Sequence, residues 1–493
     1  MDNEITIDEL TAFCKRKGFV YPSAEIYGGL AGFWDYGSLG VELKNNIKNE
    51  WWKFHVHQRE DIAGIDGSII TNPKIWSASG HVANFTDVYV TCKKCKKPNK
   101  IDKSEINKRK CDNCGGEYEV KGDFNLMFKT NIGPVESAEA GAYLRPETAQ
   151  LIFANFKLVA ENTRLNLPFG IAQIGKAFRN EISPRDFLFR CREFEQMEIE
   201  YFIHPEKRKE CKYLKNYENF ELIIYSAEMQ EKGKKSEKMK AKDALKRGII
   251  MLPWHAYWLA LETSWFLNLG ASKEKFRIRQ HLKNEKSHYA TDTWDIEYEF
   301  PFGWKELEGI ADRGNYDLSQ HEKFSGKDMK IFDEDTKKKA LPEVVCEPSL
   351  GVERAFLVFM FNAYNYDEKR KNIVLKLHPR LAPIKAAVLP IIKDKKMISV
   401  AKKIEEDLKK EWNIEYDESG SIGRRYSRQD EIGTPLCIAI DEQSSKDNTA
   451  TLRDRDTTKQ IRVKIEELND IVRKVIFGED LLKFGKIVET RVK

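Results

Sequence analysis

The sequence predicts an α+β protein with several domains, and three observations support this. A long β-hairpin is expected over residues 178–202, two close cysteine pairs lie within residues 92–114, and strands alternate with helices over residues 373–493. The 493 residues are enough for roughly two to four domains. We therefore expect a large first part that carries the chemistry, a small cysteine-held module within it, and a separate C-terminal domain.

Composition limits the possible locations of the protein. Hydrophobic residues make up 41% and charged residues 33%, and no apolar run approaches the roughly 20 residues that span a bilayer. The acidic segment Met1–Leu10 lacks the pattern of a secretory signal, so we expect a cytoplasmic protein without a membrane partner. The net charge of +5 neither requires nor excludes a nucleic-acid partner.

Residues 39–51 have the apolar spacing of a helix. Leu39, Leu43, Ile47 and Trp51 recur every fourth position and would form one buried stripe. The preceding segment, residues 28–40, is rich in glycine and aromatic residues, which is typical of an ordered loop packed on other structure.

The cysteine pairs suggest a zinc site. Residues 88–120 read as a small insertion with little apolar periodicity, and the cysteines have the Cys-x-x-Cys spacing of a zinc ribbon: Cys92, Cys95, Cys111 and Cys114. Four thiolates would close the coordination sphere, so the zinc would be structural. The alternative is a set of reduced cysteines without a metal.

A second insertion is expected over residues 203–290. Lysine and glutamate dominate residues 207–247, which favours an exposed and mobile segment, and aromatic residues over 252–266 indicate that order resumes. The boundary of the C-terminal domain is expected near Lys371, giving domains at residues 1–372 and 373–493. In the second domain we expect strands at 373–377, 436–440 and 449–453, a helix containing residues 400–412, and a closing helix from Lys464.

The hairpin carries the strongest functional signal. Turn-forming residues 183–186 divide it, and alternation along a strand would put five side chains on one face: Arg190, Arg192, Phe194, Gln196 and Glu198. Guanidinium groups suit phosphate or carboxylate, an aromatic ring can stack on a purine, and a carboxylate can hold an ammonium group. This face therefore fits an aminoacyl adenylate; the alternative is a solvated face with paired charges.

A second motif follows at residues 347–354. It runs Glu-Pro-Ser-Leu-Gly-Val-Glu-Arg and precedes an apolar helix over residues 355–361, so Gly351 would let the backbone approach a ligand at the helix start.

Together with residues 32–37 (Gly-Phe-Trp-Asp-Tyr-Gly), these motifs make the chain resemble the class II aminoacyl-tRNA synthetases over nearly its whole length, and among them the dimeric glycyl-tRNA synthetases. The resemblance implies an antiparallel catalytic sheet flanked by helices and a C-terminal anticodon-binding domain. It also implies a homodimer that uses glycine, ATP with Mg²⁺, and tRNA(Gly).

The resemblance assigns residues to ATP. Arg179 would bind the α-phosphate and the amino-acid carboxylate, Arg190 the terminal phosphates, and Arg354 one face of the adenine, and these three are the implied catalytic residues. The implied ATP site is Arg179, Asn180, Glu181, Phe189, Arg190, Cys191, Arg192, Glu193, Phe194, Glu306, Leu307, Gly351, Val352, Glu353 and Arg354. Of these, Glu306 would help to hold Mg²⁺.

The resemblance also assigns residues to glycine. The implied site is Glu147, Phe194, Glu195, Gln196, Met197, Glu198, Glu347, Pro348, Ser349, Leu350 and Gly351. Glu147, Glu198, Glu347 and Ser349 would surround the ammonium group. Exclusion of larger substrates would be steric, because a methyl group forced into a filled pocket is strongly disfavoured.

Some features depart from the family pattern or leave alternatives open. Ser38 stands where the family usually has proline, which puts the expected dimer contact in question, and Cys191 reads as a packing residue. Residues 424–426 and 452–456 are either RNA contacts or a solvated rim, and the role of His81 is open. Other readings of the whole chain are a synthetase-derived binding protein and a synthetase for another small amino acid.

Overall fold

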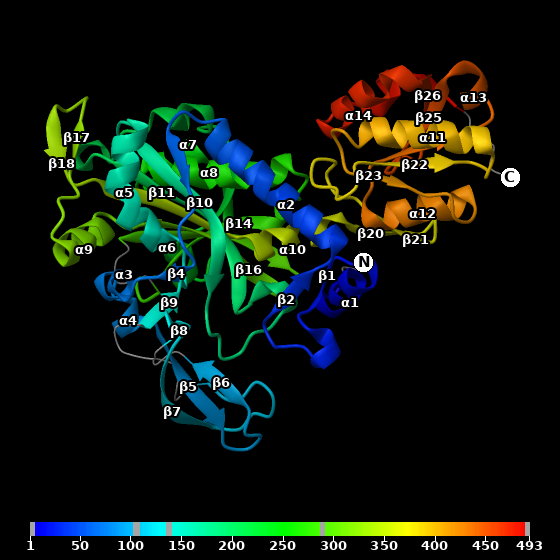
Figure 1. Ribbon diagram of the computed structural model, residues 1–493. Helices are drawn as coiled ribbons and strands as arrows, with labels where there is room; N and C mark the ends of the chain where they lie inside the picture. Colours follow the sequence, from blue (N-terminus) through cyan, green and yellow to red (C-terminus); the bar gives the residue numbers. More distant parts are fainter. Residues whose placement is uncertain (1–4, 102–108, 135–140, 286–290, 489–493) are drawn as a thin grey trace.

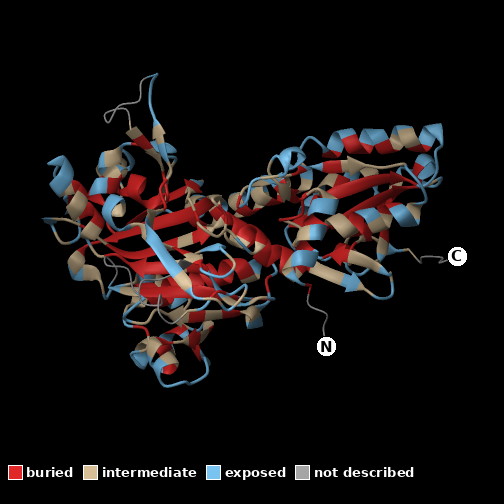
Figure 2. Ribbon diagram, turned by 90° about the horizontal axis from the view of Figure 1, so that it is seen from below, coloured by how far each residue is buried: buried red, intermediate tan, exposed pale blue. Residues whose placement is uncertain are grey.

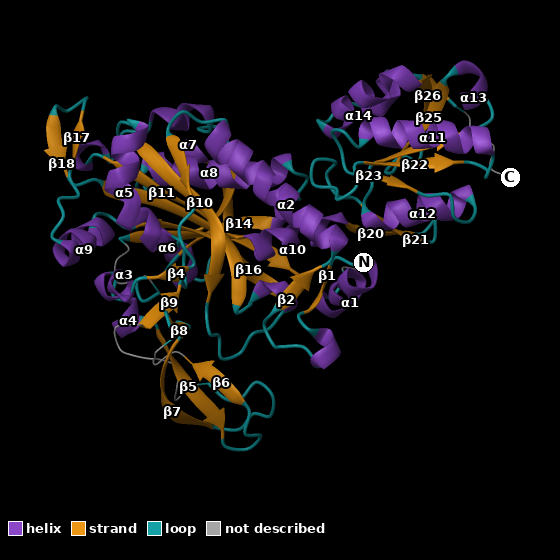
Figure 3. Ribbon diagram, viewed as in Figure 1, coloured by secondary structure: helices purple, strands orange, loops and turns teal. Residues whose placement is uncertain are grey.

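The molecule is built on two separate β-sheets, each with its own hydrophobic core (Figure 1). The structure is a computed structural model that describes residues 5–101, 109–134, 141–285 and 291–488. Parts of both predicted insertions (102–108 and 286–290) and the extreme ends of the chain lie outside these residues. Figure 3 shows strands in the interior of both halves and helices around them. The expected α+β architecture is confirmed.

The larger half contains a nine-stranded, mainly antiparallel sheet. Its strands, in spatial order, are β13 (Glu237–Lys240), β12 (Glu221–Tyr225), β14 (Phe276–Gln280), β15 (Asp292–Phe300), β16 (Gly303–Asp312), β19 (Glu343–Gly351), β11 (Glu193–Ile203), β10 (Phe169–Phe178) and β3 (Ile62–Ile65). The central strands β16, β19 and β11 lie side by side although long stretches of chain separate them.

Helices cover the two faces of this sheet differently. One face packs on a core with helices α2 (Ser38–Trp52), α8 (Pro253–Asn268) and α10 (Val352–Ala363), and we call it the helical face. The other face carries a smaller core with α5 (Ala149–Thr163) and α9 (Tyr316–Ser325). We call it the pocket face, because much of it remains uncovered by these helices. Figure 2 shows buried residues throughout the sheet and exposed ones on the outer surfaces.

The helix predicted from the apolar stripe is α2, and Leu43, Ile47 and Trp51 are buried as expected. A Cβ atom on Gly40 would lie 1.8 Å from the carbonyl oxygen of Phe19, so only glycine allows α2 to pack this closely on the preceding chain. Ser38 is the first residue of the helix.

The charged segment after β11 is more integrated than its composition indicates. It supplies β12 and β13 to the main sheet, and between them lies α6 (Ala227–Glu231). Its lysines are exposed at Lys232, Lys234 and Lys235, as predicted, whereas Met239 is buried. All residues from Trp254 to Phe266 in α8 are buried.

The C-terminal half is an α/β unit. Its sheet order is β23 (Ile414–Tyr416), β22 (Ala386–Pro390), β24 (Leu436–Ile440), β25 (Thr449–Asp454), β26 (Gln460–Lys464) and β27 (Lys486–Ile487). The helices are α11 (Lys395–Leu408), α12 (Ile422–Ile432), α13 (Ser444–Asp447) and α14 (Leu468–Ile476). A hairpin of β20 (Tyr364–Asp367) and β21 (Asn372–Leu375) joins the halves.

The predicted site hairpin differs from the structure in one respect. Its second strand, β11, begins at Glu193 and not at Phe187. Residues Phe187–Phe189 form a 3-10 turn, in which the Phe187 ring packs edge-on against Trp34 with a centroid distance of 4.8 Å. The first aromatic residues of the segment thus serve packing, and the strand starts after them.

Candidate functional site

A cleft on the pocket face collects most of the residues assigned to ATP. Its cavity volume is about 170 Å³, and its lining includes these predicted residues: Arg179, Glu181, Phe189, Arg190, Cys191, Phe194, Glu306, Leu307, Gly351, Glu353 and Arg354. Gln196 and Ser349, which were assigned to glycine, also line it, as do Leu188 and Gly309. Strands β11, β16 and β19 and the loop after β10 therefore converge on one cavity.

Arg179 lies between two aromatic rings at one side of the cleft. Its guanidinium carbon is 5.3 Å from the centroid of Phe194 and 5.5 Å from that of Phe85. Its Nε donates a hydrogen bond of 2.9 Å to the carbonyl oxygen of Pro146. These contacts orient the guanidinium group and leave its terminal nitrogens for a ligand.

Arg190 and Arg192 do not share the strand face with Phe194, which corrects the prediction. Because β11 starts at Glu193, both lie in the preceding turn. Arg190 forms an ion pair of 2.7 Å with Glu181, whereas Arg192 donates to the carbonyl oxygens of Ala31 (2.8 Å) and Glu181 (2.9 Å). Arg190 still lines the cleft, but Arg192 fixes the loop before α2.

Arg354 lies at the other side of the cleft. Its guanidinium carbon is 4.6 Å from the ring centroid of Phe189, and its Nη1 donates to the Glu306 carbonyl oxygen at 2.9 Å. The same nitrogen is 3.2 Å from the Glu306 carboxylate and lowers the pKa of that group. Glu306 therefore stays ionised and half exposed, as a magnesium ligand would need to be.

A β-bulge in β16 determines which glutamate faces the cleft. Glu306 pairs with Glu297, and Glu308 pairs with the adjacent Ile296, so Leu307 is the extra residue. Neighbouring residues of β15 point to opposite faces, so Glu306 and Glu308 do as well. Without the bulge, both glutamates would lie on the same face.

Acidic side chains form a buried cluster on the pocket face beyond Phe194. Glu198 accepts hydrogen bonds from Ser349 (2.7 Å), Gln196 (3.4 Å) and Thr148. Ligand oxygens of Glu198, Glu200 and Glu347 lie within 4.8 Å of one another. Among the described residues, neither carboxyl oxygen of Glu200 has a hydrogen-bond partner.

One buried arginine faces this acidic cluster. Arg313 donates to Glu347 at 2.6 Å and to both carboxylate oxygens of Asp317 at 2.7 and 2.9 Å. Burial raises the pKa of Glu347 to about 8. Attraction to Arg313 lowers this pKa, but repulsion from Glu198 and Glu147 offsets part of that lowering. The cluster thus holds more carboxyl groups than Arg313 can neutralise, which favours an incoming cation.

Glu147 approaches the cluster from the segment before α5. Its carboxylate lies 3.3 Å from Nε2 of His81 and accepts a hydrogen bond of 3.2 Å from Gln150. Burial alone would raise the pKa of Glu147, but His81, Arg313 and Arg179 together lower it. Glu147 is consequently the firmly ionised member of the group.

Several residues assigned to glycine or ATP do not face the cleft. The alternation of strands turns the side chains of Glu195, Met197, Pro348 and Leu350 to the helical face. Glu195 pairs with Lys48 of α2 at 2.9 Å, and Met197, Leu350 and Val352 are fully buried in the larger core. The side chains of Asn180 and Glu193 do not line the cleft either, and Glu193 pairs with Lys176.

The sequence interpretation missed Glu200, Arg313 and Asp317 and left the role of His81 open. Alternation in β11 could have identified Glu200, which follows Glu198 by two positions. Arg313 and His81 come from segments far apart in the chain, and no local pattern connects them to the hairpin.

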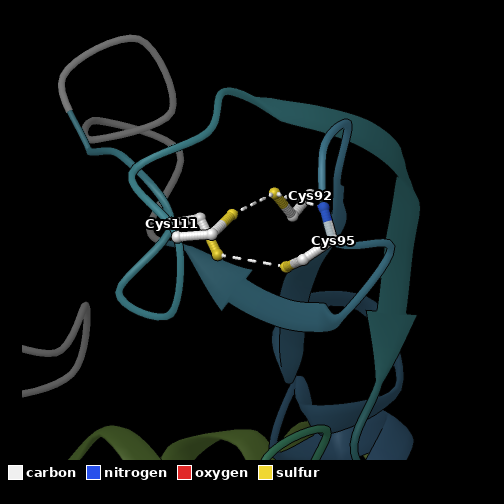
Figure 4. Close-up of side chains that lie close together, drawn as sticks. Cys92, Cys95 and Cys111 are labelled. Atoms are coloured by element: carbon white, nitrogen blue, oxygen red, sulfur yellow. Dashed lines mark hydrogen bonds between the residues drawn. The ribbon is translucent and has the colours of Figure 1, made fainter.

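The four cysteines converge at one end of a small three-stranded sheet of β5 (Thr86–Cys92), β6 (Pro98–Ile101) and β7 (Tyr118–Asn125). The Sγ atom of Cys92 lies 3.5 Å from that of Cys114, and the Sγ atom of Cys95 lies 3.6 Å from that of Cys111. Figure 4 shows the side chains of Cys92, Cys95 and Cys111 pointing into the same space. All four lie within 4.8 Å of one another. Backbone N–H groups, that of Cys95 foremost, lower the pKa of Cys92. This donor set fits a tetrahedral zinc ion, whose sulfur ligands stand about 3.8 Å apart for Zn–S bonds of about 2.3 Å.

Three arginines considered as RNA contacts instead stabilise the C-terminal domain. Arg453 forms two hydrogen bonds of 2.8 and 2.9 Å with buried Asp430, and Arg425 and Arg455 donate to the carbonyl oxygens of Pro390 (2.6 Å) and Gly433 (2.8 Å). All three are buried, whereas Arg424 is exposed.

Within the described ranges, no helix combines the length and the apolar character that crossing a membrane requires.

Comparison with known proteins identifies the family. The model of the class II tRNA synthetase core domain (G, H, P, S and T) matches residues 128–363, and that of the anticodon-binding domain matches residues 385–475. Glycine–tRNA ligase from Treponema denticola is 43% identical over 479 residues, which cover 95% of this chain and 96% of that protein. The enzyme of the same name from Geobacillus thermodenitrificans is 45% identical over 505 residues, covering 96% and 98%. Since both match almost end to end, the chain belongs to the glycine–tRNA ligase family of class II aminoacyl-tRNA synthetases.

Proposed function

We propose that this protein activates glycine with ATP and transfers it to the 3′ end of tRNA(Gly). The observation that carries this proposal is the continuity of the ATP cleft with the acidic cluster along β11. Phe194 and Glu198 lie on the same face, four residues and roughly 13 Å apart along a strand. An adenine at the first and an ammonium group at the second would span the length of an aminoacyl adenylate.

In the first step, a carboxylate oxygen of glycine attacks the α-phosphorus of ATP, and pyrophosphate leaves. Arg179 would stabilise the charge on the α-phosphate and Arg190 that on the leaving group, while Arg354 would lie against one face of the adenine. Mg²⁺, when bound with ATP, would neutralise the phosphates beside Glu306. In the second step, a terminal ribose hydroxyl of the tRNA attacks the glycyl carbonyl carbon, and AMP leaves.

Selection of glycine would follow from the filled pocket. Ser349, Gln196 and Glu198 are hydrogen-bonded to one another at 2.7–3.4 Å, so the space near the substrate α-carbon is occupied by groups that hold each other in place. A substrate with a Cβ would have to displace this network. We therefore expect alanine and serine to be rejected on binding.

Glycine-dependent ATP–pyrophosphate exchange tests the proposal. The wild-type protein should exchange with glycine and not with alanine, serine, proline or threonine. Arg179→Ala should abolish exchange, whereas Arg185→Ala, at an exposed arginine of the same loop, should leave it intact. Exchange with another amino acid would reassign the substrate, and absence of exchange with all five would favour a binding protein derived from a synthetase.

We further propose that the cysteine module binds one structural zinc ion. Protein purified without chelators should contain about one zinc per chain, and Cys111→Ser should lose it. Because the four ligands leave no open position, exchange activity should survive removal of the metal better than the fold of residues 86–125 does. Zinc-free protein with an unchanged module would contradict the assignment.

The proposed assembly is a cytoplasmic homodimer. Ile26 and Tyr27, each 86% exposed, and Leu30, 59% exposed, lie in the loop before β2 (Trp34–Tyr36), next to the start of α2. Covering these apolar side chains with a second copy would remove them from water. Ile26→Asp with Leu30→Asp should shift the mass measured by light scattering from a dimer to a monomer.

A further inference from the structure

His81 is held in a single orientation beside the acidic cluster. It begins the short helix α4 (His81–Asn84), and its ring lies 5.2 Å from the rings of both Trp76 and Phe85. The side-chain amide of Asn125 donates to the carbonyl oxygen of His81 at 3.2 Å. With only 10% of the side chain exposed, the ring has little freedom to turn.

The two ring nitrogens have different partners. Nδ1 lies 2.8 Å from the Ser79 hydroxyl, and Nε2 lies 3.3 Å from the Glu147 carboxylate. A serine hydroxyl can donate to a neutral imidazole or accept from an imidazolium. Because a carboxylate only accepts, the contact with Glu147 requires the hydrogen on Nε2. Nδ1 then accepts from Ser79 when the ring is neutral; when the ring is charged, Nδ1 donates to Ser79, whose hydroxyl can donate to the Trp76 carbonyl oxygen at 3.4 Å.

The Glu147 carboxylate is consequently held from two sides. Nε2 of His81 faces Oε2, and the amide of Gln150 donates to Oε1 at 3.2 Å. Gln150 is itself fixed by Asp317 at 2.9 Å and His321 at 3.0 Å. A carboxylate with one donor on each oxygen keeps its orientation and retains lone pairs for a ligand cation.

We propose that His81 is a positioning residue for substrate recognition: it fixes the Glu147 carboxylate in the orientation that the glycine ammonium group requires. The inference rests on the proposed function, since it assigns the ammonium group to the cluster that contains Glu147. The low pKa of Glu147, which burial opposes and His81 lowers most, supports it. His81 acts through Glu147 and does not touch the reacting atoms.

Three substitutions at one position test this proposal. His81→Ala should raise the KM for glycine in pyrophosphate exchange about 10- to 100-fold, because a hydrogen bond to a charged group is lost. His81→Gln places an amide nitrogen near the position of Nε2 and should restore the KM to within about fivefold of wild type. His81→Asn places its amide near Nδ1, within reach of Ser79 but not of Glu147, and should remain impaired.

Two further readouts separate positioning from a loss of folding. The KM for ATP and the melting temperature of all three variants should stay close to the wild-type values. His57→Ala, at an exposed histidine whose ring bonds to Trp52 at 3.1 Å, should change neither KM.

Each outcome is decisive. Equal values of the glycine KM in His81→Ala and the wild type would overturn the proposal, and so would equal impairment of the Gln and Asn variants. If His81→Ala fails to fold, the comparison of the Gln and Asn variants decides alone. Wild-type protein without glycine-dependent exchange would refute the proposed function, whereas active wild type with an unaffected Ala variant would refute only the role of His81.

Discussion

Buried carboxyl groups occur on both faces of the main sheet, and their negative charge is compensated in different ways on the two faces. On the pocket face, Glu147, Glu198, Glu200 and Glu347 surround Arg313. On the helical face, buried Glu308 is repelled by Glu262 of α8, whose Oε1 lies 2.9 Å from Nε2 of His55. Both sets are almost free of solvent contact.

The two sets differ in what compensates their buried negative charge. The helical-face group is closed, because His55 also contacts the carbonyl oxygen of Trp51 at 2.9 Å, and burial and repulsion from Glu262 raise the pKa of Glu308 well above its ordinary value. The raised pKa favours a proton on Glu308, which reduces the buried charge of this group. The pocket-face group has an excess of carboxyl groups beside a cleft, so a ligand cation can complete it. In the proposed function, the glycine ammonium group would compensate this buried negative charge.

The largest expected effect comes from removing the arginine that forms ion pairs within the pocket-face group. Arg313→Gln leaves Glu347 and Asp317 buried without their partner, which should cost about 3–5 kcal/mol of unfolding free energy and abolish glycine-dependent exchange. Urea unfolding and exchange assays measure both. Arg473→Gln, which breaks a half-exposed pair with Glu411, should cost much less. Similar losses of unfolding free energy in the two variants would contradict the expectation that the buried ion pairs of Arg313 matter more than the exposed pair of Arg473.

The open group should also couple glycine binding to proton release. The pKa of Glu347 is raised to about 8, first by burial and then by Glu198 and Glu147, so the free protein holds this proton at neutral pH. An ammonium ligand favours the ionised form. At saturating ATP, the KM for glycine should therefore fall as pH rises from 6 to 8, by up to about tenfold per unit, and level off above 8. Calorimetry in buffers of different ionisation enthalpy should detect the released proton; equal heats would contradict the coupling.

The sequence predicted the features that depend on local pattern. Spacing of Leu43, Ile47 and Trp51 predicted α2, and the C-terminal strands at 436–440 and 449–453 were also confirmed. The paired cysteines predicted a four-sulfur cluster. The resemblance to class II synthetases assigned Arg179, Phe194, Glu306 and Arg354 to one ATP site, and all four line the same cleft.

The features that the sequence did not reveal depend on tertiary packing. The run Phe187–Phe189 has high strand propensity, but packing against Trp34 turns it into a 3-10 helix and removes Arg190 and Arg192 from the strand face. The bulge at Leu307 reverses the alternation that would put Glu306 and Glu308 together. No periodicity within a segment can reveal that His81 and Arg313 meet Glu147.

Substitution of Glu308 in the helical-face group should change the free energy of unfolding and leave the kinetics of pyrophosphate exchange unchanged. Glutamine mimics a protonated Glu308 and can donate to Glu262, so Glu308→Gln should fold normally. In the wild type, the folded-state pKa of Glu308 lies above the unfolded value, so the proton it retains costs stability as pH rises past roughly 4.3, by about 1.4 kcal/mol per unit. In urea unfolding, the difference in unfolding free energy should shift toward the variant as pH rises from 5 to 8, by up to about 4 kcal/mol at about 1.4 kcal/mol per unit. An unchanged difference across this range would mean that Glu308 is ionised.

The smallest expected effect distinguishes two members of the pocket-face group. Burial, followed by repulsion from Glu347, raises the pKa of Glu200 well above its ordinary value, so Glu200 should be protonated like Glu308 although it lies on the pocket face. Glu200→Gln should change the KM for glycine by less than about threefold.

Glu198 instead accepts from three donors, namely Thr148, Ser349 and Gln196, and an amide at this position would set an N–H group against them. Glu198→Gln should therefore raise the same KM at least about tenfold. If the two variants are equally impaired, Glu200 is ionised and belongs to the cation site. If only Glu198→Gln is impaired, the ligand-binding charge resides in Glu147, Glu198 and Glu347. Glu200 is then a neutral neighbour, and its proton limits how much negative charge the fold must bury.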